Sequence, residues 1–493
     1  MVLGEGVDEA TLYDVIVVGM GAMGCASAYH LSKHGLKVLG IERQDEIGHS
    51  FGSSHGDTRI TRKAYFEHPQ YVKMVCRAYE LFAELEKTVG QKLFYKTGGL
   101  DIGPPDSPMV LGAVQACKQH DIPYEVLTSD QIHERFPGMK LPAGYVAVYQ
   151  ADAGVLRPER CNRAHYQAAF ALGARCVFGE KVTSVISELQ DGEEVFRVST
   201  PSHTFSARKV VISAGAWMRD EALQWPVVAR GPETLRKALS LLEVERQVVA
   251  WHVPQDASLY HHSRFPIYLV HHRVDPESNS ALPPPDNSQL LEDNTAKIVP
   301  TYTEIVSQPG KDYFYYGFPM MDEDKGVKMA RYNHLFEISS PDHLKRTVDH
   351  EDLRTNHDLL ENFFTSIKLP EYLHPQLPPI GVAHSAACMF TNTPDGHFVI
   401  DAFNTRKNKL TGGGIVSASA AVTREVNGEV MTGASGEDTC DNNIVVMSAC
   451  SGHGFKFAAS IGEAVAHLLT GKRRKDIEWL NSMRFKDMPE RKV

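Results

Sequence analysis

The chain has 493 residues, with 51 basic and 61 acidic side chains that give a formal net charge of -10. Apolar residues make up 42% and charged residues 23%, a balance typical of folded globular proteins, and this length predicts two or three domains. The mild acidity, without any run of five or six basic residues, argues against nucleic acid or an anionic membrane surface as partners.

The first fifty residues carry the pattern of a strand, a helix and a second strand. The β-branched run at 13–18 predicts a buried strand that ends at Gly19. Residues 22–33 predict a helix that stops at His34 and Gly35, and residues 37–42 predict the next strand. Together these segments predict one βαβ unit.

The rest of the chain alternates further helices and strands. Helices are predicted at 71–89 and 158–172, and strands within 92–102 and at 175–185, 196–213, 245–252, 265–271, 313–318 and 326–332. This order predicts an α/β fold of two domains (α+β), in which a doubly wound, Rossmann-like domain carries an inserted antiparallel-sheet domain. Two segments rich in Pro, Gly, Ser and Asn, 277–296 and 404–443, are predicted to be surface additions.

The turn after the first strand has the spacing GxGxxG, formed by Gly19, Gly21 and Gly24. Glycines there permit a tight turn, close approach of a pyrophosphate to the backbone, and close packing of helix on strand. The pyrophosphate would lie at a helix N-terminus, and Glu42 at the end of the next strand would accept hydrogen bonds from a ribose. The motif leaves FAD and NAD both open, although its N-terminal position and a second glycine-bearing strand end at 213–217 favour FAD.

Three distant segments resemble the monomeric sarcosine oxidase family, which includes N-methyltryptophan oxidase and pipecolate oxidase and has the D-amino-acid-oxidase-like fold. They are Gly52-Ser-Ser-His-Gly-Asp-Thr-Arg-Ile-Thr-Arg62, Ala387-Cys-Met-Phe-Thr-Asn-Thr-Pro-Asp-Gly-His-Phe-Val-Ile-Asp401 and Ser451-Gly-His-Gly-Phe-Lys-Phe457. The likeness extends from Tyr13 to about Leu480, apart from the two additions. It implies an FAD-binding domain at 1–90, 150–230 and 385–480, a substrate domain at 91–149 and 231–384, and a surface insertion at 404–443.

The resemblance also implies roles for individual residues. Cys388 would link covalently to FAD, His55 and Arg59 would lie beside the flavin ring, and Lys328 would assist oxygen. Arg62 and Lys456 would hold a substrate carboxylate, and Tyr316 would line the pocket. The remaining residues implied in cofactor binding are Gly19, Gly21, Ala22, Met23, Gly24, Glu42, Arg43, Ser53, Ser54, Thr58, Val182, Gly215, Trp217, Gly452, His453, Gly454 and Lys456.

Each of these residues has a simpler interpretation, which stays open. Cys388 could be an ordinary buried thiol, and Arg59 and Arg62 could form surface ion pairs of little consequence. Lys328 and Lys456 could be solvated, although a lysine among apolar neighbours, such as Lys456, needs a partner.

The chain also departs from the family's pattern. The family's simplest members have a tyrosine where this sequence has Phe390, and a histidine where it has Tyr332, unless His334 takes that place. The loss of polar groups favours a substrate larger or more apolar than sarcosine.

These features predict an FAD-dependent oxidase of a secondary amino acid, N-methylated or cyclic. A hydride would pass to flavin N5, the imine would hydrolyse, and O2 would be reduced to hydrogen peroxide. The alternatives are an amine dehydrogenase that uses another electron acceptor, and a flavin-binding protein without this amine chemistry. The expected partners are the small amino acid and O2, in a monomer or small homo-oligomer.

Cysteine usage and hydropathy lead to an expectation for location. The eight cysteines form no CxxC pair, which suggests neither zinc nor a disulfide framework, and the His261-His262 and His271-His272 pairs lack helical ligand spacing. No metal site is therefore expected. No apolar run reaches about 18 residues, and the acidic start lacks a secretory signal's apolar core, so we expect a cytoplasmic protein without a membrane span.

Overall fold

The computed structural model describes residues 6–273, 312–332, 336–374, 378–405, 425–426, 429–430 and 441–488. The predicted addition at 277–296, most of that at 404–443, and His334 lie outside the described residues. The chain divides into two compact units. The first unit is Met1–His49, Asn162–Leu242 and His397–Val493, and the second is Ser50–Cys161 and Glu243–Gly396. The assignment of FAD binding to one domain and substrate binding to the other stays a prediction.

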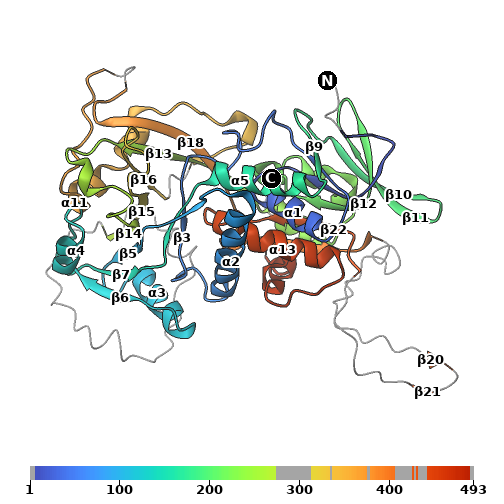
Figure 1. Cartoon of the computed structure of the whole chain (residues 1–493), viewed down its shortest axis with the longest axis horizontal. Helices are drawn as coiled ribbons and strands as arrows, with labels where there is room; N and C mark the ends of the chain where they lie inside the picture. Colours follow the sequence, from blue (N-terminus) through green and yellow to red (C-terminus); the bar gives the residue numbers. More distant parts are fainter. Residues whose placement is uncertain are drawn as a thin grey trace. The chain divides into compact units, whose positions relative to one another are not determined.

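The first unit is built on a largely parallel sheet. Its parallel strands lie in the order β22 (Ile444–Ser448), β12 (Thr204–Ile212), β1 (Leu12–Val18), β2 (Val38–Ile41) and β9 (Arg175–Val177). Antiparallel strands β10 (Ser184–Gln190) and β11 (Glu193–Ser199) extend it beside β12, and β19 (Val399–Phe403) pairs with β22. The strands of the parallel core are almost fully buried, as expected for a sheet covered on both faces (Figure 1).

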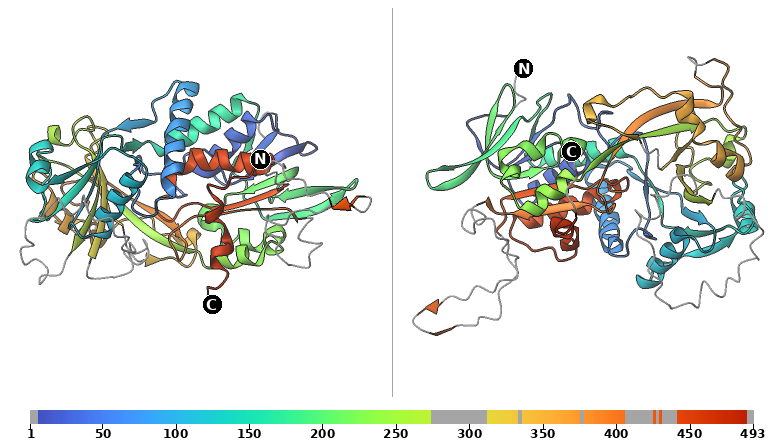
Figure 2. Two further views of the ribbon diagram at one scale, coloured as in Figure 1. Left: turned by 90° about the horizontal axis from the view of Figure 1, so that it is seen from below. Right: turned by 180° about the vertical axis from the view of Figure 1, so that it is seen from behind.

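Helices pack on this sheet. They include α1 (Ala22–Lys33), α6 (Pro226–Ala229), α7 (Glu233–Ser240), α13 (Ala458–Leu469) and most of α5 (Pro158–Ala171). Helices α1 and α13 lie side by side in the views of Figure 2, and a Cβ at Gly462 would come within 2.5 Å of the Ala26 backbone. The absence of a side chain at Gly462 therefore allows the two helices to approach closely.

The second unit is built on a largely antiparallel sheet. Its order is β17 (Phe336–Glu337), β13 (Glu243–His252), β16 (Val327–Arg331), β15 (Asp312–Phe318), β14 (Ile267–Arg273), β5 (Gly99–Gly103), β7 (Val146–Gln150) and β6 (Glu125–Thr128). The long strand β18 (Val382–Asn392) also pairs with β13, and β14 pairs with β5 in parallel. A small sheet joins β3 (Arg59–Thr61), β8 (Gly154–Leu156) and β4 (Phe94–Lys96).

In the described part of the second unit, the α-helices include α2 (Tyr71–Val89), α3 (Pro108–Gln119), α4 (Ser129–Arg135), α10 (His350–Arg354) and α11 (His357–Phe363). Local sequence explains how several of them begin. Ser107 caps α3 by accepting from the Val110 N–H, and Thr128 forms a capping box with Gln131 at α4.

The predicted fold class is confirmed, including the βαβ unit and the helix at 71–89. Two strand predictions were wrong. The expected strand at 175–185 is β9 followed by a loop and the start of β10, since Gly179 turns the backbone with a φ of +70°. The expected strand at 196–213 is a β11–β12 hairpin, whose Thr200 N–H donates to the His203 carbonyl across the turn.

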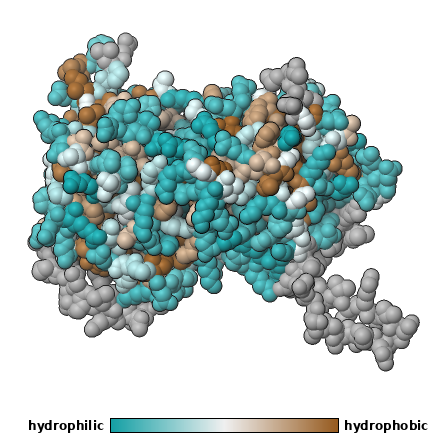
Figure 3. Space-filling model, in the orientation of Figure 1, coloured by the Kyte–Doolittle hydropathy of each residue, from teal (hydrophilic) through white to brown (hydrophobic). Residues whose placement is uncertain are grey.

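Among the described residues, no helix is both long and apolar enough to cross a membrane. The face drawn in Figure 3 mixes hydrophobic side chains with hydrophilic ones, as ordinary protein surfaces do.

Candidate functional site

The glycine loop of the first unit has the geometry of a dinucleotide cradle. Gly19 adopts a φ of +85°, where a Cβ would lie 2.6 Å from the Ser213 carbonyl oxygen. A Cβ at Gly24 would collide with the Gly19 carbonyl oxygen. Gly21 is the N-cap of α1 and supplies no side-chain cap, while Ala22 and Met23 form the first turn. The backbone at this helix N-terminus therefore fits a pyrophosphate.

Glu42 lies directly after β2 and is 4% exposed. One carboxylate oxygen accepts from the Met20 N–H at 2.8 Å, and the other accepts from the Gln44 N–H at 3.0 Å. His49 Nε2 lies 3.4 Å from the same carboxylate. Glu42 therefore ties the glycine loop to the end of β2, which is where the sequence places a ribose.

Other predicted cofactor residues of the first unit lie near the same strand ends. The Arg43 guanidinium lies over the Trp217 ring, 4.3 Å from its centroid. The Glu221 carboxylate lies 3.6 Å from the same guanidinium. Gly215 begins the short helical turn after β12 with a φ of +57°, and Val182 is buried in the core of this unit.

The C-terminal loop of the first unit is tightly turned. Gly452 has a φ of +70°, a Cβ at Gly454 would meet the Ala449 carbonyl oxygen, and the His453 ring packs 4.8 Å from Phe398. Lys456 is buried and donates to the His453 carbonyl at 2.8 Å. The alternative interpretation, in which Lys456 is exposed to solvent, is therefore wrong, because its ammonium is buried and donates a hydrogen bond.

In the second unit, Lys328 on β16 is 2% exposed. Its Nζ donates to the Gly56 carbonyl at 2.5 Å and to Thr58 Oγ1 at 3.1 Å, and the Trp251 and Phe318 rings flank it at 5.1 and 4.8 Å. The solvated alternative for this lysine is also wrong.

Lys328 has an unusually low pKa, close to neutral pH. Burial, and then the charge of Arg59, lower the pKa of Lys328 to about 7, although Cys388, Asp57 and Glu159 act in the opposite direction. A lysine with this pKa exchanges a proton readily at physiological pH.

Cys388 lies on β18, opposite Gln247 of β13, and is 5% exposed. Its Sγ lies 3.9 Å from His55 Nδ1. Burial alone raises the pKa of Cys388, but His55, Arg59 and Lys328 together outweigh it and lower the pKa to about 7. The thiol is therefore more nucleophilic at neutral pH than an ordinary buried cysteine.

His55 and Arg59 complete this cluster. Arg59 donates to the Thr58 carbonyl and to the Ser53 carbonyl, each at 2.8 Å, so it braces the loop that contains Ser53 and Ser54. The buried Nε2 of His55 has no hydrogen-bond partner among the described residues, which leaves this nitrogen suited to contact a further polar group. These residues therefore fit a flavin beside them.

Arg62 is 2% exposed and is already engaged by acidic side chains. One guanidinium nitrogen donates to both Glu67 oxygens, at 3.0 and 2.8 Å, and another donates to the Ala64 carbonyl. The Asp101 carboxylate lies 3.6 Å from its Nε. Neither Glu67 nor Asp101 was predicted from the sequence. Glu67 lies five positions from Arg62, so it could have been considered as a partner, whereas Asp101 lies on the distant strand β5.

Tyr316 on β15 lies in a cluster with Cys388. Its ring is 6.2 Å from that of Tyr332, which in turn lies 5.4 Å from Phe390. The two positions that depart from the family's pattern therefore face each other as an aromatic pair.

The structure thus gathers His55, Arg59, Lys328 and Cys388 within the second unit, although up to 333 residues separate them in sequence. Arg62 belongs to the same unit, whereas the glycine loop, Glu42 and Lys456 belong to the first. A convergence of Arg62 and Lys456 on one carboxylate stays a prediction.

Comparison with known proteins identifies the family. The model described as DAO, FAD dependent oxidoreductase, matches residues 14–468. The monomeric sarcosine oxidase of Streptomyces avermitilis is 32% identical over 479 residues, which cover 97% of this chain and 99% of that protein. The N-methyl-L-tryptophan oxidase of Yersinia pestis is 28% identical over 455 residues, with 92% and 94% coverage.

A solved structure agrees with this fold. NikD, described as an unusual amino acid oxidase essential for nikkomycin biosynthesis, has a TM-score of 0.67 at 20% identity, covering 96% of this chain and 98% of NikD. The resemblance inferred from the three sequence segments is confirmed. The chain belongs to the DAO family of FAD dependent oxidoreductases.

Proposed function

We propose that this protein is an FAD-dependent oxidase of a secondary amino acid, N-methylated or cyclic, which yields an imine and hydrogen peroxide. The observation that carries the proposal is the group formed by the buried Lys328, His55 and Cys388 and the half-buried Arg59. Burial and Arg59 lower the pKa of the lysine, and His55, Arg59 and Lys328 lower the pKa of the thiol. Bound FAD would supply the redox chemistry, by accepting a hydride from the amine and returning electrons to oxygen.

Cys388 is the residue proposed to attach the flavin. With a pKa of about 7, a large fraction of the thiol is ionised at neutral pH, and the thiolate is the nucleophilic form. His55 stabilises that thiolate from 3.9 Å.

Lys328 is proposed to assist the oxygen reaction. The Gly56 carbonyl and Thr58 hold its ammonium in place, so a positive charge is preorganised where negative charge develops on oxygen. Retention of this buried lysine favours oxygen over another electron acceptor. The dehydrogenase alternative predicts instead that turnover is faster with an artificial dye than with oxygen.

Arg62 and Lys456 are proposed to bind the substrate carboxylate. A guanidinium binds a carboxylate through two charge-assisted hydrogen bonds, but Arg62 must first give up Glu67, so substrate binding exchanges one carboxylate for another. The Tyr332 and Phe390 pair favours an amine with an apolar substituent. The relatives named for sarcosine and for N-methyl-L-tryptophan support the N-methyl class.

The proposal includes a cytoplasmic location and a monomer or small homo-oligomer. No disulfide joins the described cysteines, which is compatible with a reducing compartment.

The test begins with acid precipitation of the purified holoenzyme. Covalent attachment predicts that the yellow colour stays with the pellet, and that Cys388→Ala releases it to the supernatant. A panel of N-methylated and cyclic amino acids is then added anaerobically. Bleaching of the flavin, followed by peroxide formation on admission of air, supports the proposal, whereas a flavin that no member of the panel bleaches overturns it.

A further inference from the structure

The position of the Lys328 ammonium depends on a short segment of backbone. Its acceptors are the Gly56 carbonyl at 2.5 Å, Thr58 Oγ1 at 3.1 Å and the Thr58 carbonyl at 3.4 Å. A shift of residues 56–58 by an ångström would remove these contacts. Whatever holds this segment therefore also holds the lysine.

The segment has a conformation that needs support. Gly56 has a φ of +95° and Asp57 a φ of +71°, which is uncommon for a residue with a side chain. The N–H groups of both residues donate to one oxygen of Glu159, at 2.7 and 3.1 Å. Glu159 thus holds the N–H side of the segment and leaves its carbonyls directed to Lys328.

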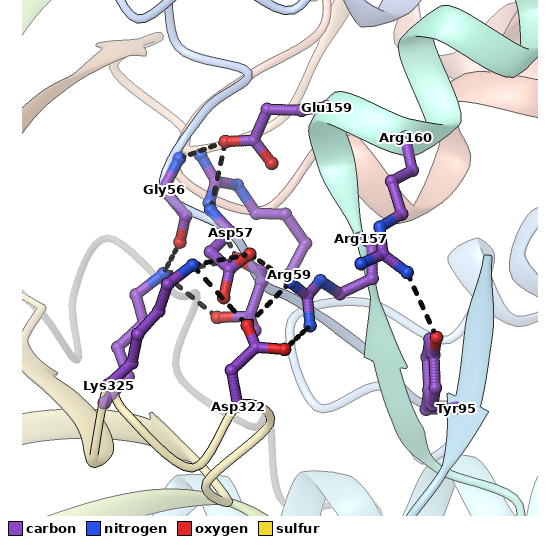
Figure 4. Close-up of polar contacts among 11 residues, drawn as sticks. Gly56, Asp57, Arg59, Tyr95, Arg157, Glu159, Arg160, Asp322 and Lys325 are labelled. Carbon is purple, nitrogen blue, oxygen red and sulfur yellow. Dashed lines mark hydrogen bonds and ion pairs between the residues drawn. The ribbon is translucent and has the colours of Figure 1, made fainter. Parts of the chain in front are cut away.

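A second support comes from Arg157, whose side chain is 7% exposed. Its guanidinium pairs with Asp57 and also with Asp322, 2.9 Å away, and Lys325 lies 3.7 and 3.5 Å from these same two carboxylates. Figure 4 shows Arg157 and Lys325 around the two aspartates. Asp322 and Lys325 belong to the turn that leads from β15 into β16.

The Arg157 guanidinium therefore joins the segment that accepts hydrogen bonds from Lys328 to the turn that precedes Lys328 in the chain. Asp57 lies between the two residues that accept from Lys328, and Asp322 lies in the turn just before the strand that carries it. Arginine suits this bridge because its planar fork can donate to two carboxylates at once, whereas a lysine presents a single point charge.

We propose that Arg157 is a positioning residue for Lys328, because it fixes the segment 56–58 relative to the turn before β16. This inference rests on the proposed function for its effect on oxygen chemistry, but the tie itself is independent of that role. The residues that face Lys328 and share its environment are Arg59, Cys388, Asp57 and Glu159.

The test compares holoenzyme variants by amide hydrogen exchange and by kinetics. Arg157→Gln removes the bridge, and Arg157→Lys keeps one charge. Arg160→Gln is the matched control, since Arg160 lies three residues along and donates to the Tyr95 hydroxyl at 3.3 Å. Lys328→Met reports the loss of the lysine itself. If Arg157→Gln does not fold, Asp322→Asn, which breaks one arm of the bridge, takes its place.

We expect exchange in a peptide covering 54–60 to rise about tenfold in Arg157→Gln, less in Arg157→Lys, and not at all in Arg160→Gln. The rate constant for reaction of the reduced enzyme with oxygen should fall by about tenfold or more, since a misplacement of about 1 Å can cost up to about a hundredfold. Anaerobic reduction by substrate should change less than twofold.

Exchange at 54–60 that stays within twofold of the wild type overturns the proposal, and so does exchange that rises equally over the whole chain. The proposal is also overturned if exchange at 54–60 rises locally in Arg157→Gln but only Lys328→Met slows the reaction of the reduced enzyme with oxygen. If neither Arg157→Gln nor Lys328→Met slows the reaction with oxygen, although exchange at 54–60 still rises in Arg157→Gln, the tie by Arg157 stands. The role given to Lys328 in the proposed function then fails.

Discussion

Replacing Lys328 by methionine is expected to stabilise the protein near neutral pH. In the unfolded chain this lysine titrates near its ordinary pKa of 10.5, whereas burial and Arg59 lower the pKa in the folded protein to about 7. Because the unfolded state binds the proton more tightly, burial of the lysine lowers the free energy of unfolding below pH 10.5. The cost is largest below pH 7 and disappears as the pH rises through 10.5.

The magnitude follows from the two pKa values. The cost is about 4 kcal/mol at pH 7 and about 2 kcal/mol at pH 9. Methionine removes it but leaves the Gly56 carbonyl and the Thr58 hydroxyl without their donor, which costs about 1 to 3 kcal/mol. The net stabilisation at pH 7 is therefore about 1 to 3 kcal/mol. The change between pH 7 and pH 9, about 2 kcal/mol, does not depend on the lost hydrogen bonds.

The assay is urea unfolding followed by tryptophan fluorescence at both pH values. Parent and variant both carry Cys388→Ser, because the thiol would otherwise titrate in the same range. Removing the thiolate also removes a charge that raises the pKa of Lys328, so the expected effect does not become smaller. Thermal scans at two heating rates check reversibility.

A stability difference that stays constant between pH 7 and pH 9 would refute a pKa of about 7 for Lys328 in the folded protein. A variant less stable than its parent at pH 7 would show that the hydrogen bonds of Lys328 outweigh the cost of its burial.

Three other changes test the remaining parts of the candidate site. Glu67→Gln removes the carboxylate that engages Arg62, so the KM for an amino acid substrate should fall about three- to tenfold in steady-state assays; an unchanged KM would argue against Arg62 as the carboxylate ligand. In flavin-free protein, iodoacetamide should modify Cys388 with a midpoint near pH 7, and His55→Gln should raise that midpoint; equal midpoints would contradict the pairing. Gly24→Ala places a methyl group against the carbonyl of the motif's first glycine, so the flavin content of purified protein should fall at least about tenfold, and a full content would show that the loop can adjust.

Local sequence was sufficient to predict the parts of this protein whose structure depends on neighbours along the chain. The βαβ unit follows from a buried strand, three glycines and a helix of mostly small and apolar residues within thirty residues, and Gly19 has the positive φ that the turn requires. The β pattern at 196–213 was misleading, because a turn of four polar or proline residues, 200–203, interrupts it.

The candidate site could be predicted as a set of residues, through the resemblance, but not as an arrangement. Lys328 meets Gly56 across 272 positions, and Cys388 meets His55 across 333. Nothing in local periodicity indicates that Arg62 lies beside Asp101, or that Arg157 bridges two loops.

Only the tertiary structure decided which of these charges are buried and which neighbours they have. A lysine and a cysteine have ordinary pKa values in an extended chain. In the folded protein, desolvation raises the electrostatic free energy of a charge, and the charges that packing brings within a few ångströms decide which protonation state is stable. The sequence by itself therefore determined the fold class and the candidate residues, while long-range packing determined their chemistry.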